Sequence, residues 1–250
     1  MSRSPLLRVQ KLWKSFDDQV VLENLSFDVA AHEFVTIVGA SGCGKTTFLR
    51  LLLGVERASR GQILLDDLPL PDEPGPQRGI VFQRYALFPN LTVTEHLLLP
   101  QELAASPLSA RLFGGSRRAA RERSHALLRD VGLFDARYRY PHQLSGGMQQ
   151  RLSIAQSVIA EPRILLLDEP FGALDPGVTG DMHRLILELW RRRGMTVFMV
   201  THDIKEGFTL GTRMLVFDRP RDSTTGAPGG AKITYDIPLK RPDAAPPPAM

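Results

Sequence analysis

The first third of the chain carries the hydrophobic patterns of β-strands. Apolar and polar residues alternate over residues 6–29, which predicts strands of a half-buried sheet. The apolar run at residues 33–38 predicts a buried strand, and residues 61–65 and 79–83 predict two further short strands. Between these strands, residues 45–53 predict a helix that ends at the following glycine.

The pattern changes in the middle of the chain. Leu, Ala, Arg and Ser are frequent in residues 86–156, which predicts a helical subdomain inserted into the fold. Helical spacing is clearest at residues 121–131. Residues 104–123 contain two adjacent glycines and many basic side chains, so we expect a loop with one solvated helix there.

Strands and helices alternate again in the last third. Aliphatic runs at residues 164–167 and 195–200 predict buried parallel strands, and residues 181–193 place apolar side chains on one helical face. Residues 232–239 predict an edge strand. This alternation is typical of an α/β core built on a mostly parallel sheet.

Composition and charge limit the class of protein. A content of 43% hydrophobic and 23% charged residues is usual for a globular chain, and we expect one domain over residues 1–219. The Pro-, Gly- and Ser-rich residues 220–250 predict an extension that is partly disordered. The net charge of +4 suits phosphate ligands or an anionic membrane surface and does not require nucleic acid.

Cysteine usage and hydropathy indicate a soluble chain in a reducing compartment. Cys43 is the single cysteine, so no internal disulfide can form. No apolar run reaches the length of roughly 18 to 20 residues that a membrane helix requires. We therefore expect any role at a membrane to come through partners.

A glycine-rich motif lies between the strand predicted at residues 33–38 and the helix predicted at residues 45–53. It matches G-x-x-x-x-G-K-[ST] and comprises Gly39, Ala40, Ser41, Gly42, Cys43, Gly44, Lys45 and Thr46, followed by Thr47. Glycines let backbone N–H groups turn toward phosphate oxygens, and the helix N-terminus adds partial positive charge. Lys45 can bind the terminal phosphates and Thr46 can bind Mg²⁺, so we favour a nucleotide site over an ordinary glycine-rich turn.

An acidic pair ends the strand predicted at residues 164–167. Asp168 follows that strand at the carboxyl edge of the sheet, where it can help to hold Mg²⁺ through water. Glu169 can then orient or deprotonate the water that attacks the γ-phosphate. Alone, the pair would indicate a solvated loop; together with the glycine-rich motif, it predicts catalysis.

A third motif, LSGGMQQR, lies between the other two. Its Ser145, Gly146 and Gly147 lead into a helix and form a second potential anion-binding end. The glycine-rich motif, LSGGMQQR, LLLDEP, ALD and THD follow one another in the order found in ATP-binding cassette (ABC) ATPases. The chain resembles that family over residues 6–218.

The resemblance implies an α/β fold and roles for single residues. The fold would be a P-loop NTPase (RecA-like) core with an N-terminal antiparallel β subdomain and an inserted α-helical subdomain. Gln83 would contact Mg²⁺ or the attacking water, and His202 would hydrogen-bond the γ-phosphate. Asp175 would pass information between two subunits. Phe16, where many members have Tyr, would stack on adenine.

The family also explains the second anion-binding end. Two cassettes face each other head to tail, so the SGG segment of each closes on the ATP and Mg²⁺ bound by the other. We expect a homodimer, or a pair with a homologous cassette, in which Ser145 and Gly147 lie far from Lys45 of the same chain. Partners would be integral membrane permease subunits and, indirectly, a solute-binding protein. The chain would lie peripherally at the cytoplasmic face of the bacterial inner membrane.

Three kinds of protein share these motifs: transporter ATPases, chromosome or DNA-repair ATPases, and RNA-binding translation proteins. The interval between Gln83 and LSGGMQQR lacks the sustained heptads of chromosome ATPases, and a single cassette disfavours the translation class. We therefore expect a transporter subunit without a nucleic-acid partner. Its motifs resemble those of importers, and most of all the nitrate/sulfonate/taurine branch.

Two further expectations concern single positions. Cys43 lies at a helix start, where the pKa of a thiol tends to fall, so a bulky thiol reagent should inactivate the chain. The alternative is that Cys43 is a small buried filler. The family resemblance also implies that the surface after Gln83 docks a helix of the membrane partner. This surface includes Tyr85, Leu87, Phe88 and Pro89, which would mark a partner site if exposed and only core if buried.

Overall fold

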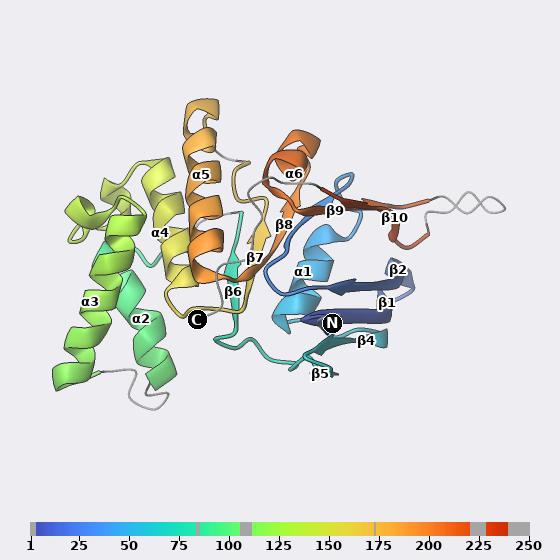
Figure 1. Cartoon of the computed structure of the whole chain (residues 1–250), viewed down its shortest axis with the longest axis horizontal. Coiled ribbons are helices and arrows are strands. Elements are labelled where there is room, and N and C mark those ends of the chain that lie inside the picture. Colours follow the sequence, from blue (N-terminus) through green and yellow to red (C-terminus); the bar gives the residue numbers. More distant parts are fainter. Residues whose placement is uncertain (1–3, 84–85, 106–111, 173, 221–228, 240–250) are drawn as a thin grey trace.

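The computed structural model describes residues 4–83, 86–105, 112–172, 174–220 and 229–239 of the 250-residue chain. They form two β-sheets with a helix between them, and further helices cover the outer face of the larger sheet (Figure 1). A lobe of helices lies to one side, at the left of the figure.

The smaller sheet accounts for the alternating pattern near the start of the chain. Its strands, in sheet order, are β2 (Gln19–Val29), β1 (Leu7–Phe16), β4 (Arg60–Leu65) and β5 (Leu68–Pro69). Neighbouring strands are antiparallel. Val9 and Leu12 are both buried because the register shifts between them, where Lys11 has a φ of 45°. The result is the half-buried sheet expected from the sequence.

The larger sheet is the mostly parallel sheet expected from strand–helix alternation. Its order is β10 (Lys232–Pro238), β9 (Arg213–Asp218), β3 (Phe34–Val38), β8 (Thr196–Thr201), β7 (Ile164–Asp168) and β6 (Arg78–Val81). The strands from β9 to β6 are parallel, and β10 pairs antiparallel with β9. Because parallel strands end at one edge of a sheet, the segments after β3, β6, β7 and β8 converge.

Helices cover both faces of this sheet. They are α1 (Lys45–Leu53), α2 (Val93–Ala105), α3 (Gly114–Asp130), α4 (Gly146–Val158), α5 (Pro176–Arg193) and α6 (Ile204–Leu210), with 3₁₀ turns at Phe134–Ala136 and Pro141–Gln143. α1 lies between the two sheets, whereas α4 and α5 pack on the opposite face of the larger one. α2 and α3 form the lobe beyond α4.

Phe48 on α1 connects the two sheets. Its ring centroid lies 5.8 Å from that of Phe27 on β2, 6.3 Å from that of Phe198 on β8 and 5.8 Å from that of Phe217 on β9. Removing a buried aromatic side chain of this kind costs about 3–5 kcal/mol of folding free energy. This packing fixes the position of α1 and of the loop that precedes it.

The helical region contains the solvated helix that the sequence predicted. α3 begins at Gly114, so the solvated helix expected within residues 104–123 and the helical spacing at residues 121–131 belong to one continuous helix. Ala120, Ser124 and Leu127 are buried, but most other residues of α3 are exposed, and many are charged. A buried stripe this narrow gives a weak helical period, which is why the sequence pattern predicted a solvated helix here without locating its first residue.

The C-terminal segment joins the larger sheet. β10 lies at the edge of that sheet, which confirms the edge strand expected at residues 232–239. Residues 232–238 thus share a sheet with β9, although they belong to the extension expected at residues 220–250. The end of that extension, from residue 240 on, lies outside the described residues. In the described parts of the chain, no helix is both long and apolar enough to cross a membrane.

Candidate functional site

The glycine-rich motif joins the end of β3 to the start of α1. A Cβ atom at Gly39 would lie 2.2 Å from the carbonyl oxygen of Phe217, and one at Gly44 would lie 2.7 Å from Cδ2 of Leu22. Gly44 also has a φ of 90°, in the left-handed region that favours glycine. Close packing against both sheets therefore requires glycine at these two positions.

A cavity of about 370 Å³ opens over this loop. Its lining residues are Gln19, Val21, Ser41, Gly42, Gly44, Lys45, Thr46, Thr47, Glu169 and Arg219. The cavity has the size of a small-molecule site, and it brings most of the predicted phosphate-binding residues together with the predicted base. Gly39, Ala40 and Cys43 complete the loop but do not line the cavity.

Lys45 is buried at the base of the loop. Its Nζ donates hydrogen bonds to the carbonyl oxygens of Gly39, at 2.7 Å, and Ala40, at 2.9 Å. A phosphate oxygen is a charged and stronger acceptor, so the amine can exchange these neutral partners for a nucleotide. Cys43 is only 3% exposed, and its Sγ lies 3.8 Å from Lys45 Nζ. Its burial supports the small filler rather than the reactive thiol.

Thr46 and Asp168 bring a hydroxyl and a carboxylate together. Thr46 Oγ1 donates to Asp168 Oδ1 at 3.1 Å. Burial raises the pKa of Asp168, the hydrogen bond from Thr46 lowers it, and the nearby charge of Glu169 raises it further. Two oxygen donors beside a phosphate cavity fit Mg²⁺, which takes few protein ligands and completes its shell with water and phosphate. The described residues contain no cluster of three His, Cys, Asp or Glu side chains that could hold a metal.

Glu169 lies at the centre of a polar cluster. Its φ of 46° is unusual for a residue other than glycine, and its N–H donates to the carbonyl oxygen of Val200 on β8 at 3.0 Å. Gln83 Nε2 donates to Glu169 Oε2 at 3.3 Å, and His202 Nδ1 lies 3.4 Å from the same oxygen. The ends of β6, β7 and β8 thus bring together the three residues that were expected to act on the attacking water and the γ-phosphate.

Phe16 lies next to one end of the cavity. It is 40% exposed, and Lys14 Nζ lies 4.4 Å from the centroid of its ring. Across the β1–β2 hairpin, Phe16 pairs with Gln19, which lines the cavity. An exposed ring in this position can stack on a base, so the geometry is compatible with the predicted adenine contact.

The SGG segment does not line this cavity. Ser145 Oγ accepts a hydrogen bond from the N–H of Met148 at 3.4 Å and so caps α4. A Cβ atom at Gly147 would meet Val178 on α5 at 2.9 Å. α4 and α1 lie on opposite sides of β7 and β8 in Figure 1. Asp175, just before α5, is also absent from the cavity wall.

Three cavity residues were not predicted from the sequence: Gln19, Val21 and Arg219. Gln19 and Val21 lie at the start of β2, and Arg219 follows β9 directly. None of them has a fixed spacing to the glycine-rich motif. Their convergence depends on how the two sheets pack around α1, which a motif search does not see.

Comparison with known proteins shows the family. The family described as ABC transporter matches residues 22–172, which is more than half of the chain. The chain belongs to the ABC transporter family. The matched segment of this ABC cassette includes the phosphate loop, the SGG segment and the acidic pair.

Curated relatives are named for one transport process. The spermidine/putrescine import ATP-binding protein PotA of Vibrio cholerae is 41% identical over 229 residues, which cover 90% of this chain and 58% of that protein. PotA of Bacillus anthracis is 38% identical, and the match covers 89% of this chain and 66% of that protein. This chain therefore spans less than two thirds of the length of either relative. Their names do not confirm the nitrate/sulfonate/taurine branch expected from the sequence.

Solved ABC cassettes share the fold. The dimeric structure of a post-hydrolysis state of the cassette MJ0796, bound to ADP and Pi, is 27% identical with a TM-score of 0.74, and covers 94% of this chain and 99% of that one. The structure of cbiO1 from Clostridium perfringens is 24% identical with a TM-score of 0.76, and covers 94% and 88%. The expected α/β architecture is confirmed: this chain has the P-loop NTPase fold of ABC ATPase cassettes.

Proposed function

We propose that this cassette binds ATP with Mg²⁺ and hydrolyses the ATP as one of a pair of subunits that power an ABC importer. The polar cluster around Glu169 carries the proposal, because it reaches the same cavity as Lys45 and Thr46. Phosphate binding, metal binding and water activation can then occur in one site. The family membership and the solved cassette with bound ADP and Pi support this chemistry.

The cavity residues divide the work of phosphoryl transfer. Lys45 and the loop N–H groups bind the terminal phosphates, and Thr46 and Asp168 hold Mg²⁺ directly or through water. When bound, Mg²⁺ supplies positive charge between the phosphates. Glu169 orients the attacking water or accepts its proton, while Gln83 and His202 hold the carboxylate in place.

The SGG segment is the basis for a pair of cassettes. It provides a capped, glycine-rich helix start that does not line the cavity of its own chain. Against the cavity of a second chain, the N-terminus of α4 would add N–H donors and partial positive charge to the bound phosphates. We propose a homodimer, and a pair with a homologous cassette is the alternative. The dimeric form of MJ0796 supports this arrangement.

An apolar surface beside Gln83 is the proposed docking site for permease subunits. Phe82 and Phe88 are 44% and 47% exposed, whereas Leu87 packs against the core. Tyr85, which was predicted for the same surface, lies outside the described residues. Two exposed aromatic side chains this close in sequence favour a protein contact. A permease bound here would place the cassette peripherally at the cytoplasmic face of the bacterial inner membrane.

The cargo is proposed from the relatives alone. Both relatives are named for spermidine/putrescine import, so we propose a polyamine delivered by a solute-binding protein. These names replace nitrate, sulfonate and taurine as the first solutes to test. They also disfavour the alternative of an ABC ATPase that acts on nucleic acid or the ribosome.

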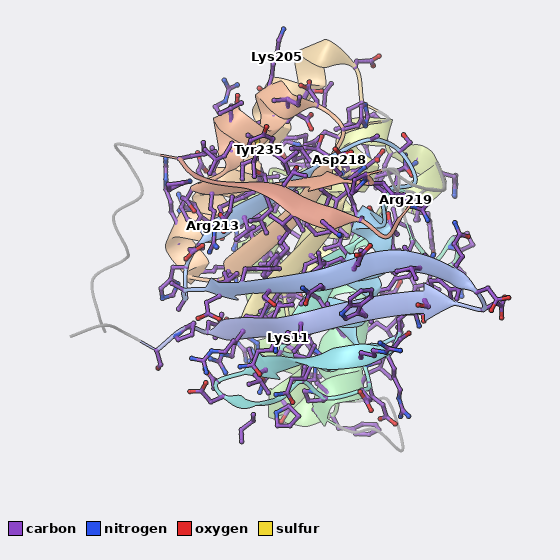
Figure 2. All side chains as sticks on the ribbon, turned by 90° about the vertical axis from the view of Figure 1, so that its right-hand side faces the viewer. Lys11, Lys205, Arg213, Asp218, Arg219 and Tyr235 are labelled. Carbon is purple, nitrogen blue, oxygen red and sulfur yellow. The ribbon has the colours of Figure 1, made fainter. Side chains whose placement is uncertain are left out.

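Hydrolysis by the purified chain is the first test. Turnover of Mg-ATP should rise more steeply than linearly with chain concentration, because two chains form the active unit. Lys45→Ala should abolish turnover, whereas Lys205→Ala should not, because Lys205 is exposed on α6 and points away from the protein (Figure 2). Turnover strictly proportional to concentration would contradict the pair. Full turnover by Lys45→Ala would contradict the site.

A transport experiment then tests the cargo. Proteoliposomes that contain the cassette, its permease subunits and the solute-binding protein should take up spermidine or putrescine in an ATP-dependent manner. Nitrate and taurine serve as comparison solutes. If one of them drives ATP hydrolysis and neither polyamine does, the proposed cargo is wrong while the proposed ATPase stands.

A further inference from the structure

We infer that Arg219 is a second cationic ligand of the nucleotide. Its guanidinium would bind the phosphate chain from the side of the cavity that the start of β2 lines. The inference rests on the ATP site proposed above and extends it to a residue outside the motifs of the family. Arg219 follows the last residue of β9 and lines the same cavity as Lys45 and Thr46.

Two carbonyl groups fix the guanidinium in place. Arg219 Nε donates to the carbonyl oxygen of Gly229 at 2.7 Å, and Nη2 donates to that of Val20 at 3.0 Å. The side chain is half-buried. In Figure 2, Arg219 lies beyond the end of β9, on the side that faces the β1–β2 sheet. Segments far apart in sequence thus hold one arginine at the edge of the nucleotide cavity.

The acceptor at Gly229 is itself held against β2. Ala231 N donates to Val21 O at 2.9 Å, and Gly230 N donates to Glu23 Oε2 at 3.1 Å. A Cβ atom at Gly230 would lie 2.6 Å from a methyl group of Val20, so only glycine fits there without displacing the strand. The C-terminal segment therefore forms part of the frame around the nucleotide site.

The bonds of Arg219 hold its charge without neutralising it. Within the described residues, both acceptors of the guanidinium are neutral carbonyl groups. The neighbouring carboxylate of Asp218 accepts a hydrogen bond from the backbone N–H of Arg219 instead, at 2.7 Å. An arginine carries five N–H donors and prefers to bind phosphate with two of them at once. Two donors are used by the carbonyls, which leaves donors for a ligand.

The position of Val20 indicates which part of a nucleotide Arg219 meets. Gln19 and Val21, on either side of Val20, both line the cavity. Gln19 pairs with Phe16, the proposed adenine platform, whereas Val21 packs against the phosphate loop at Gly44. The guanidinium therefore lies between the base and the loop, at the level of the phosphates nearest the ribose. ATP and ADP share those phosphates.

Calorimetric titration of ATP and ADP into the full chain tests this inference. Arg219→Gln removes the charge and keeps a donor, so it should weaken binding of both nucleotides about tenfold, as expected for a lost charge-assisted hydrogen bond. Arg219→Lys keeps the charge but loses the planar set of donors, so its affinity should fall between those of wild type and Arg219→Gln. Lys232→Gln is the matched control, because Lys232 is a neighbouring cation that pairs with Glu23 outside the cavity.

The salt dependence of affinity separates ligand binding from a structural role. Losing a charge that contacts phosphate should make ATP binding by Arg219→Gln less sensitive to ionic strength than in wild type or Lys232→Gln. If Arg219→Gln binds both nucleotides within twofold of wild type, or binds weakly with an unchanged salt dependence, the inference is overturned and the ATP site stands. If the wild-type chain binds no ATP, the proposed function itself is wrong.

A measurement on the wild-type chain covers the case in which Arg219→Gln does not fold. Phenylglyoxal modifies accessible arginines, and peptide mass spectrometry reports the extent at each position. Mg-ATP and ADP should both slow modification of Arg219, and Arg118, exposed on α3, should react equally with and without nucleotide. Modification of Arg219 at the same rate under saturating ATP would contradict the contact.

Discussion

α1 and α4 both begin at a glycine-rich turn, but only α1 completes a cavity within its own chain. The phosphate loop before α1 lines the cavity together with Glu169. α4 begins after Ser145, whose hydroxyl caps the helix, and the SGG residues lie outside that cavity. Helix starts of similar chemistry thus have different surroundings.

This difference shows that a helix start able to bind anions becomes a catalytic site only when other segments supply the reactive side chains. Around α1, the ends of β6, β7 and β8 supply Gln83, Glu169 and His202. Next to Gly147, the close neighbour is the apolar Val178. The SGG helix start offers N–H donors but does not line the cavity that holds Lys45 and Glu169, so it can serve as half of a phosphate site. We therefore assign the other half to a second cassette.

The largest effect is expected from the acid at the complete site. Glu169→Gln should lower the rate of ATP hydrolysis about 10²- to 10⁴-fold, because the base that acts on water is lost, while ATP affinity changes little. Phosphate release and calorimetric titration measure the two quantities. Glu161→Gln is the control, because Glu161 also has a positive φ but is paired with Arg193 on the surface. Wild-type turnover by Glu169→Gln would remove Glu169 from this role.

A matched pair of substitutions at Ser145 tests the role of the start of α4. Ser145→Asp and Ser145→Asn both preserve a capping side chain, but only Asp places a negative charge where the partner's phosphates would lie. Because like charges in contact cost several kcal/mol, Ser145→Asp should hydrolyse ATP roughly ten- to a hundredfold more slowly than Ser145→Asn. Binding of ATP to the single chain should be the same for both. Weaker binding by the Asp variant alone would place Ser145 in the cavity of its own chain.

The close packing of the phosphate loop should also contribute to the free energy of folding. Gly44→Ala should destabilise the fold by about 1–3 kcal/mol, because Gly44 has a φ of 90° and faces Leu22 closely. Gly177→Ala in α5 meets no neighbour within 4 Å and should stabilise by up to about 1 kcal/mol. Denaturant unfolding compares the two variants. Equal stability would show that the loop does not require glycine at position 44.

The smallest effect concerns α2, whose N-terminus is capped by the carboxylate of Glu95. Thr92 donates to Glu95 Oε2 from both its N–H and its hydroxyl, and these bonds lower the pKa of Glu95. The stabilisation is therefore present above the pKa that Glu95 has in the unfolded chain, and is lost as pH falls through the lower folded pKa. Because Glu95 is exposed, we expect less than about 1 kcal/mol, which Glu95→Gln should remove. Urea unfolding from about pH 3 to about pH 7, a range that spans the ordinary pKa of a glutamate, measures it.

Most of the fold followed from periodicity, and the exceptions have a physical reason. The helix at residues 45–53 and the strands on either side of α1 have strong apolar patterns and lie where they were expected. The sequence predicted the solvated helix α3 but not its first residue, because only a thin stripe of this helix is buried. The hydrophobic period of a helix or strand reflects how much of its surface is buried, so the period is weak where little of that surface is buried.

The candidate site divides in the same way. Lys45 and Asp168 could be identified from the sequence because each belongs to a short motif. The local backbone geometry of that motif requires particular residue types beside them. Gln19 and Arg219 reach the cavity only through the packing of two sheets around α1 and through the carbonyl of Gly229. Contacts between distant segments leave no local pattern, so the structure was needed to find them.

ATP-dependent association of the Glu169→Gln variant tests the central claim most directly. Its mass in solution, measured by sedimentation or light scattering, should change from monomer to dimer when Mg-ATP is added. Adding Ser145→Asp should abolish the dimer while each chain still binds one ATP, and adding Ser145→Asn should preserve it. An ATP-saturated Glu169→Gln chain that remains a monomer, or a dimer that tolerates Ser145→Asp, would contradict a site shared between two cassettes.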